Sequence, residues 1–391
     1  MENTKWRSGL DMIYLAVCAL HGKTPSTEYV SKMDLEAVYK QSCRHSMDSI
    51  TFMAVKDCIS AQAYPELFPK WERSYTLATR KILLFELERE KLISFMEREK
   101  IWYLPMKGII LQNYYPSIGM RQMADNDIFF DNTRRRDIKK YMVDNGFSVK
   151  TYGQGAHDVY LKKPVFNFEM HAYLYTESFN DLFFRYYQNA KDCLIKDDSN
   201  GYGYHLSKED FYIYIITHLF KHFDHGGAGV RFLMDIYTFV KAENNFLDWE
   251  YIKSELSKLD LASFEEGARR MAFKLFSEEC TYFGADESLL DDAERAILDY
   301  YIGSGTYGTV ANNVQGALSK LAEGKGTTNK TKGKYILRRL FPNMLYYKDA
   351  YPFLYKYKVF IPFFLVYRFF RAIILHPKKI ISQLLIIKRT K

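Results

Sequence analysis

The spacing of apolar and polar residues changes character twice along the chain. Residues 1–100 show helical spacing, which predicts helices at 34–47 and 72–100. One face of the second helix is expected to pack against the rest of the protein, and its apolar members are Leu77, Leu84, Leu87, Leu92 and Phe95. The N-terminal region is therefore expected to be helical.

Short apolar runs with alternating polarity follow, and they are typical of strands. They lie at residues 101–106, 124–130, 147–152, 158–162 and 165–175, with helical stretches at 109–114 and 133–145 between them. Helical spacing returns at 208–222, 230–242, 249–259 and 262–283. This order predicts an α+β fold, in which helices at 1–100 precede a small mixed-sheet α/β core at 101–206, and a helical domain at 207–321 closes one side of a cleft.

The C-terminal part differs in composition from the rest of the chain. The Gly, Thr, Asn and Lys content of residues 322–334 predicts a mobile linker before a basic, aromatic segment at 335–391. The most apolar stretch, 359–375, is interrupted by Pro362, Arg368 and Arg371, and its charge-free part is shorter than the roughly 20 residues of a spanning helix. We therefore expect no transmembrane helix in it.

The composition excludes disorder and a disulfide framework. Of the 391 residues, 48% are hydrophobic and 17% aromatic, which is enough for one large core or two ordinary ones. The five cysteines are scattered and show no CxxC spacing, so neither a disulfide framework nor a structural zinc site is indicated. The N-terminus carries acids early and resembles no secretory signal, so a cytoplasmic protein is expected.

The net charge of +8 is distributed unevenly. Residues 332–391 hold 14 Lys and Arg against Asp349 alone, and this surplus of 13 leaves the first 331 residues at −5. A nucleic-acid-binding core would spread basic residues over its folded face, so no specific nucleic-acid partner is expected. Aromatic, aliphatic and basic residues alternate over 341–391, which suits peripheral binding to an anionic membrane at its inner face. The alternative is that these aromatic residues pack on the helical domain.

Acidic residues in the predicted strands are the densest chemical signal. Asp125 and Asp127 flank Asn126, and a period of two places both carboxylates on one face, where they could share magnesium ions. A D-x-D sequence also arises by chance. In the strand at 165–175, Glu169 shares a face with Asn167 and His171, while Phe166, Phe168 and Met170 face the other way. Three carboxylates on neighbouring strands favour two-metal phosphoryl or nucleotidyl transfer, unless Glu169 lies on the solvent face of an edge strand.

Basic residues near the acids could bind phosphate. Lys107 and Gly108 lie where a predicted strand meets a helix, so the glycine permits close backbone approach and the lysine can neutralise an anion. The sequence contains no P-loop. Arg121, four residues before Asp125, is either another phosphate ligand or a surface charge.

These residues, in this order, resemble the uncharacterised nucleotidyltransferase family of the polymerase-β-like superfamily. The resemblance is carried by Lys107-Gly108, Tyr115-Pro116, Gly119-Met120-Arg121, Asp125-Asn126-Asp127-Ile128 and Glu169-Met170-His171. It extends to His45, to His218 and His222 with the following Arg231 and Asp235, and to the aromatic tail from Phe341. One departure is the spacing: the wider superfamily usually has Gly-Ser or Gly-Gly about ten residues before its acid pair, whereas Gly108 stands 17 residues before Asp125.

The resemblance implies transfer of a nucleoside monophosphate from an NTP, such as ATP, to a hydroxyl or phosphate of a small molecule, a glycan or lipid intermediate, or a protein. Asp125, Asp127 and Glu169 would be catalytic and would bind two Mg²⁺ or Mn²⁺ ions, with Glu169 also helping to deprotonate the acceptor. The triphosphate would be bound by Lys107, Gly108 and Arg121. Candidate substrate contacts are His171, His218, His222 and Arg231. The alternatives are kinase-like phosphotransfer on the same fold and a non-catalytic nucleotide-binding protein.

Two further expectations concern charge and histidine. Three facing carboxylates repel one another, so Asp127→Asn is expected to keep or raise stability without metal. His218 and His222 share a helical face, but the H-E-x-x-H pattern of a zinc helix is absent. They are therefore expected to be buried structural residues or to face substrate.

Overall fold

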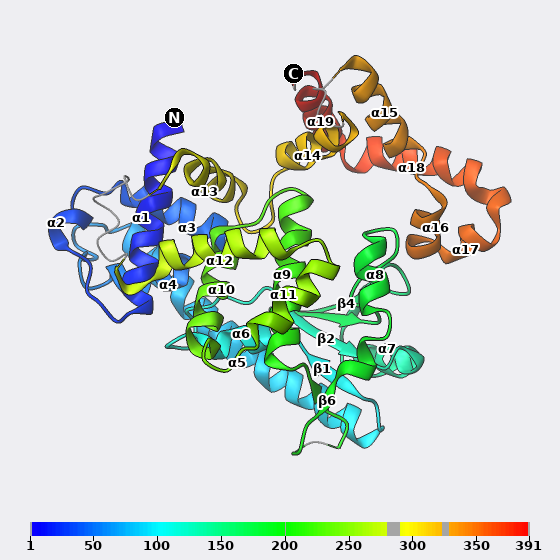
Figure 1. Ribbon diagram of the computed structural model, residues 1–391, viewed down its shortest axis with the longest axis horizontal. Coiled ribbons are helices and arrows are strands. Elements are labelled where there is room, and N and C mark those ends of the chain that lie inside the picture. The colour runs from blue at the N-terminus through cyan, green and yellow to red at the C-terminus, as the bar shows by residue number, and fades with distance from the viewer. Residues whose placement is uncertain (1, 200, 280–289, 323–327, 390–391) are drawn as a thin grey trace.

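The computed structural model describes residues 2–199, 201–279, 290–322 and 328–389 (Figure 1). The fold is α+β, as predicted. The strands are β1 (Tyr103–Pro105), β2 (Asn126–Phe130), β3 (Ser148–Thr151), β4 (His157–Lys162), β5 (Phe166–His171), β6 (Ile195–Lys196) and β7 (Tyr204–His205). The helices are α1 (Glu2–Leu20), α2 (Thr27–Val30), α3 (Leu35–His45), α4 (Asp48–Val55), α5 (Leu67–Arg98), α6 (Gly108–Leu111), α7 (Arg135–Asp144), α8 (Asp181–Tyr187), α9 (Lys208–Asp224), α10 (Val230–Glu243), α11 (Trp249–Lys258), α12 (Ala262–Phe276), α13 (Asp292–Ser304), α14 (Val310–Ala322), α15 (Asn329–Leu340), α16 (Met344–Ala350), α17 (Pro352–Lys356), α18 (Ile361–Leu375) and α19 (Pro377–Arg389).

The central sheet is mixed. Its strand order is β1-β2-β5-β4-β3, with β2 and β5 parallel and the other neighbours antiparallel. Each of the five predicted apolar runs overlaps one of these strands, and only β4 begins one residue before its predicted run, so the strand prediction is confirmed. The parallel pair at the centre places the two predicted acidic strands side by side.

The two faces of the sheet differ in chemistry because side chains alternate along each strand. Ile128, Phe130, Phe168 and Met170 lie in one buried cluster with residues of α5 and α7. Asp127 and Glu169 belong to the alternate positions of the same strands and face away from this core. The sheet therefore has one apolar face covered by helices and one polar face available for chemistry.

The predicted packing face of the long helix α5 is partly wrong, because Leu84, Leu92 and Phe95 pack against the core but two of the predicted leucines do not. Leu77 is 48% exposed and Leu87 is 58% exposed. The buried side chains include those of Ala78, Ile82, Phe85, Leu92 and Met96, of which Leu92 alone was predicted. These positions, spaced by three, four or seven residues, form the apolar stripe that covers the sheet, whereas the two leucines lie on the opposite side of the helix.

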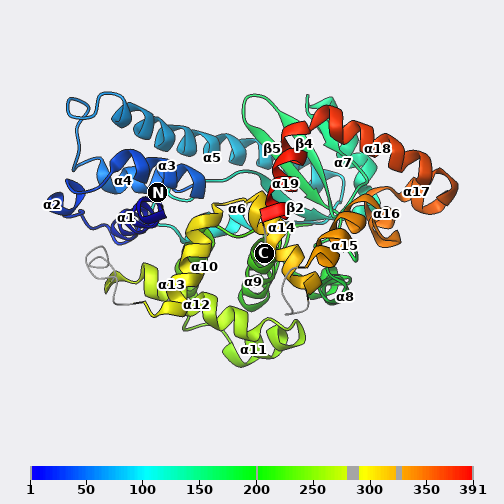
Figure 2. The same ribbon diagram turned by 90° about the horizontal axis from the view of Figure 1, so that it is seen from above.

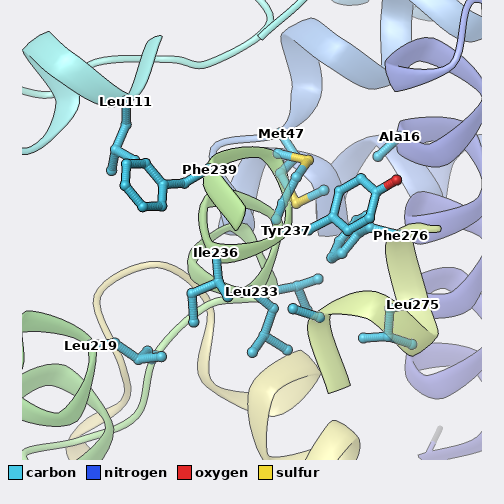
Figure 3. Packing of buried hydrophobic residues seen from close by; sticks show 14 of the residues in the cluster. Ala16, Met47, Leu111, Leu219, Leu233, Ile236, Tyr237, Phe239, Leu275 and Phe276 are labelled. Carbon is cyan, nitrogen blue, oxygen red and sulfur yellow. The ribbon is translucent and has the colours of Figure 1, made fainter. Parts of the chain in front are cut away.

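The second core joins the N-terminal helices to the helical domain. Residues of α1, α4, α9, α10 and α12 contribute to it, and Figure 3 shows Leu233, Ile236, Tyr237 and Phe239 of α10 projecting towards neighbouring helices. The helix α1 was not predicted as a separate element from the sequence. α12 ends at Phe276, so the predicted helix at 262–283 is too long, and its last residues, 280–283, lie outside the described part of the chain.

His45 of α3 contacts both α10 and α13 and is fully buried. Its Nδ1 accepts a hydrogen bond from the backbone N–H of Val230 at 3.1 Å, and its Nε2 lies 3.2 Å from the carbonyl oxygen of Ile302. Burial lowers the pKa of His45 to about 3, so the ring is neutral and suited to accept one bond and donate the other. His45 therefore holds the start of α10 in place.

The predicted linker at 322–334 is partly wrong. α15 begins at Asn329, because the Thr328 side chain caps the helix and forms a reciprocal capping box with Thr331. Residues 323–327 of the predicted linker lie outside the described residues. The prediction relied on glycine and asparagine content and missed this capping signal.

The C-terminal helical segment, residues 335–389, forms an arm beside α8, as Figures 1 and 2 show. One contact between the arm and the sheet region runs through Asp349, whose carbonyl accepts from the Gly155 N–H at 2.8 Å and whose carboxylate accepts from the Ser178 N–H at 2.9 Å. Within the described residues, no single helix has the length and hydropathy needed to cross a bilayer. Only the pair formed by 358–375 and 380–389, bent by 94°, satisfies both together.

Candidate functional site

A cavity of about 330 Å³ lies between the polar face of the sheet and helices α9 and α10. All ten residues singled out from the sequence as site residues line it, although they come from separate segments of the chain. They are Lys107, Gly108, Arg121, Asp125, Asp127, Glu169, His171, His218, His222 and Arg231. The structure thus brings the candidates together, and their chemical roles stay predictions.

The three acids meet where β2 and β5 run parallel. Asp127 pairs in register with Glu169, and Asp125 lies one residue before β2 begins. Asp127 is 3% exposed, whereas Glu169 and Asp125 are half-buried. The two strands therefore bring the carboxylates of Asp127 and Glu169 onto one surface, with Asp125 beside them at the strand entrance.

Asp127 is already neutralised within the protein. Its Oδ1 accepts a hydrogen bond from the Lys107 Nζ at 2.6 Å and another from the His171 Nε2 at 2.8 Å. Burial alone would raise the pKa of Asp127, but the Lys107 ammonium and the bond from His171 outweigh it and hold the pKa well below its usual range. The expectation that Asp127→Asn would relieve repulsion therefore does not match its surroundings, because Asp127 is the partnered acid.

Asp125 and Glu169 carry the repulsion instead. Burial and the charges of Asp127 and Glu169 raise the pKa of Asp125 to about 7. Burial and Asp127 likewise raise the pKa of Glu169, whose Oε2 lies 3.4 Å from the His157 Nε2. Within the described residues, Asp125 forms no ion pair. The ionised forms of Asp125 and Glu169 are thus disfavoured, and the ionised Asp127 lies beside them. Together the three carboxylates offer the oxygen donors that hard divalent cations prefer.

The backbone at Lys107 is strained. Its φ is 51° and its ψ is −118°, a conformation that side chains other than glycine rarely adopt. The residue directly precedes α6, which has only four residues and continues into a short 3₁₀ turn. The predicted helix N-terminus is thus too short to bind an anion through a helix dipole, and the Lys107 side chain is the group that this junction presents to the cavity.

Gly108 is required by the position of Arg121. A Cβ atom at residue 108 would lie 2.6 Å from the Arg121 Nη1. The guanidinium cannot move aside easily, because its Nε and Nη2 donate to the two carboxylate oxygens of Asp235 at 2.7 and 3.0 Å. Asp235 also accepts from the Tyr115 hydroxyl at 2.7 Å. Arg121 is therefore a buried, fixed cation whose Nη1 lies beside Gly108.

Arg231 of α10 lines the same cavity as the acids and is 8% exposed. Its Nη1 donates to the carbonyl oxygen of Gln122 at 3.0 Å, while its buried Nε has no hydrogen-bond partner in the described part of the chain. Among the residues that the structure describes, no carboxylate forms an ion pair with it. Burial and the charge of Arg121 lower the pKa of Arg231. An arginine in this state is suited to bind an anion that enters the cavity.

Helix α9 contributes His218, Lys221 and His222 to the lining of the cavity. The ring centroids of His218 and His222 lie 4.7 Å apart, and the rings are arranged edge to face. Burial and nearby cations lower the pKa of His222 to about 4 and that of His218 well below its usual range, so both rings are neutral. Burial and the Lys107 charge lower the pKa of Lys221 to about 8.

Several lining residues were missed from the sequence, among them His157, Tyr214 and Lys221. Lys221 could have been found, because it stands three positions after His218 and therefore shares its helical face. His157 is the first residue of β4 and lay just outside the predicted strand, so alternation could not assign it a face. For Tyr214, the apolar surroundings in α9 gave no signal.

Comparison with known sequences gives one match. The model of a family described as uncharacterised nucleotidyltransferase matches residues 31–277, a span that contains all ten candidate residues. Neither the curated proteins nor the solved structures include a match.

Proposed function

The chain belongs to the uncharacterised nucleotidyltransferase family, and on that basis we propose that it transfers a nucleoside monophosphate from an NTP to an acceptor in a metal-dependent reaction. The acceptor group would be a hydroxyl or a phosphate of a small molecule, a glycan or lipid intermediate, or a protein. The cavity between β2, β5, α9 and α10 would be the active site.

The charge arrangement in the cavity is the observation that carries this proposal. Two ion pairs are complete, Lys107 with Asp127 and Arg121 with Asp235. Asp125 and Glu169 on one side have raised pKa values, and Arg231 and Lys221 on the other have lowered ones. A nucleoside triphosphate with divalent cations brings positive charge to the two acids and negative charge to the two basic residues. The ionised forms of both pairs would therefore be stabilised on binding.

The cation side of such a ligand fits the three acids. Asp125, Asp127 and Glu169 would hold Mg²⁺ or Mn²⁺, since carboxylate oxygens are the donors that these ions prefer. Bound there, the ions would offset the charge of the triphosphate and polarise its phosphoryl group.

The phosphate side fits the basic residues. Lys107 would exchange its bond to Asp127 for one to a phosphate oxygen, so the ammonium remains paired while the Asp127 carboxylate binds the cation. The Nη1 of Arg121 beside Gly108 and the unpartnered Nε of Arg231 would donate to further oxygens. In this arrangement Arg121 stays anchored on Asp235 and holds the triphosphate rather than following it.

Glu169 would act on the acceptor. With its raised pKa, its carboxylate can take the proton from an acceptor hydroxyl as that oxygen attacks the α-phosphorus. A bond forms between the acceptor oxygen and the α-phosphorus, and the bond from the α-phosphorus to pyrophosphate breaks. His157, whose pKa burial and His171 lower to about 3, would be a neutral neighbour of Glu169.

The test follows a phosphate label. Purified protein is incubated with Mg²⁺ or Mn²⁺, a cell extract as source of acceptor, and each NTP labelled at either the α- or the γ-phosphate. The proposal predicts α-label in an acceptor product and pyrophosphate release, both lost in Glu169→Gln. Transfer of γ-label with nucleoside diphosphate release would indicate phosphotransfer on the same fold, and nucleotide binding without transfer in any extract would indicate a binding protein.

A further inference from the structure

Helix α18 carries an apolar stripe that no other part of the described chain covers. Its members are Phe363, Val366, Tyr367, Phe370 and Ile374, whose exposed fractions are 73%, 58%, 57%, 57% and 72%. Their spacing of three or four residues places them on one side of the helix. A continuous aromatic and aliphatic surface of this kind is uncommon on a protein that meets only water, and it marks an interaction site.

The neighbouring surface is apolar as well. Helices α15, α18 and α19 enclose a cavity of about 410 Å³, lined largely by leucine, isoleucine and aromatic side chains. Ile381, Leu384 and Leu385 of α19 are about half exposed. The α18 residues that line this cavity include Leu365, Phe369 and Ile373, which lie on the side of the helix opposite the stripe, so α18 is apolar on both sides.

The charge of the arm restricts what can cover this surface. The sequence from 332 to 391 has 14 basic residues and one acid, Asp349. That acid is turned towards the sheet region, where its carboxylate accepts from Ser178, while Arg371 beside the stripe is exposed. The outer surface of the arm therefore combines apolar side chains with net positive charge and almost no negative charge.

This combination favours one occupant. A second copy that docked arm to arm would bring a surface of the same sign, so the two arms would repel each other. A nucleic acid would meet the basic residues, but an uncharged stripe offers its phosphates no partner. The headgroup region of an anionic membrane accepts both features at once, because apolar side chains enter the acyl boundary while lysine and arginine meet anionic lipids.

We propose that the arm, residues 335–389, docks this protein on the surface of an anionic membrane through the stripe on α18. The helices would lie in the interface, with Phe363 and Phe370 inserted and Arg371 at headgroup level. This inference does not depend on the proposed transfer reaction, since it uses none of the cavity residues.

Flotation with vesicles tests it on the full chain. The vesicles are phosphatidylcholine alone, or phosphatidylcholine with an equal part of phosphatidylglycerol, each at low and high salt. The variant is Phe363→Ser with Phe370→Ser, and the matched control is Phe246→Ser, because Phe246 is 71% exposed but lies outside the arm. All three side chains are exposed, so thermal unfolding should change little in either variant.

The wild type and the control are expected to float with the anionic vesicles at low salt and less at high salt. The double variant should partition about tenfold or more weakly, since two large apolar side chains no longer leave water. Absence of wild-type flotation with anionic vesicles at low salt, equal binding to both kinds of vesicle, or equal binding by the double variant would each overturn the proposal. A wild-type dimer that the double variant abolishes, without vesicle binding, would identify a second copy as the occupant and overturn it too.

Discussion

Replacing Asp125 or Asp127 by asparagine should change stability in opposite directions in the metal-free protein. The two acids stand two positions apart, and both substitutions keep the shape while removing a charge. Asp127 has Lys107 and His171 as partners, whereas Asp125 has repulsion from Asp127 and Glu169. Asp127→Asn should therefore destabilise, and Asp125→Asn should stabilise.

The magnitudes follow from burial and charge. Asp127→Asn leaves the Lys107 ammonium, 15% exposed, without its ionised partner, which costs about 3 kcal/mol for a buried pair broken on one side. The pKa of Asp125 rises from 3.8 to about 7 on folding. At ~1.4 kcal/mol per unit, the penalty that Asp125→Asn removes is at most about 4 kcal/mol, and solvent at this half-buried site reduces it.

The pH dependence identifies the cause. A carboxyl whose pKa is raised on folding contributes stability below its unfolded pKa and loses that contribution as pH rises through its folded pKa. The gain from Asp125→Asn should therefore be largest near pH 8 and nearly absent near pH 4. For Asp127 the folded pKa is lowered, so the loss in Asp127→Asn should stay nearly constant from pH 8 to pH 4 and should shrink only below the unfolded pKa of 3.8.

The assay is urea unfolding followed by circular dichroism, in the presence of a chelator, for the wild type and both variants across that pH range. The matched control is Asp144→Asn, because the Asp144 side chain is 55% exposed and pairs with Lys140 on the surface of α7. An exposed pair of this kind contributes at most about 1 kcal/mol, so the control should unfold close to the wild type. Equal shifts of the same sign in the Asp125 and Asp127 variants, or an Asp127→Asn protein as stable as the wild type, would refute the assignment of partners.

Three further predictions concern single residues. Gly108→Ala should raise the KM for NTP by about tenfold while the fold persists, because the new Cβ would meet the Nη1 of Arg121, which Asp235 holds in place. Initial rates against NTP concentration measure the KM, and an unchanged KM would contradict this prediction. Arg231→Gln should weaken NTP binding by about tenfold or more and leave stability unchanged or higher, whereas Arg231→Lys should retain part of the binding. Calorimetric titration measures the affinities, and equal affinity in the wild type and both variants would exclude Arg231 from the site. His45→Ala should lower stability by about 2 kcal/mol without changing the KM of the folded fraction, because the Val230 N–H and the Ile302 carbonyl lose the imidazole as a partner. An effect on KM alone would show that His45 acts on substrate.

The sequence predicted the strands because alternation is a local pattern, whereas the grouping of His218, His222 and Arg231 with the acids came from the resemblance to the family. Alternation along β5 correctly separated Phe168 and Met170 from Glu169, and the parallel neighbour β2 then had to bring Asp127 beside it. The packing face of α5 could not be read in the same way, since leucines occur on both sides of this helix and only the sheet selects the stripe at Ile82 and Phe85.

The charge state of the site was beyond the sequence for a similar reason. Nothing in the spacing indicates that Lys107, 20 positions before Asp127, bonds to it and not to solvent. Arg121 pairs with Asp235 across 114 positions, and the repulsion falls on Asp125 only because Asp127 is already paired. Such pairings depend on tertiary contacts between helices and strands that no local pattern encodes.

The proposed function requires that this cavity bind a nucleoside triphosphate through divalent cations on the three acids. Its most direct test is a crystal structure with Mn²⁺ and a non-hydrolysable NTP, in which anomalous scattering locates the metal. We expect manganese on the carboxylates of Asp125, Asp127 and Glu169, with the triphosphate against Lys107 and Arg231. Manganese held instead by the nitrogens of His157 and His171, whose ligand atoms lie within 4.8 Å of each other and of Glu169, or a triphosphate bound outside the cavity, would contradict it.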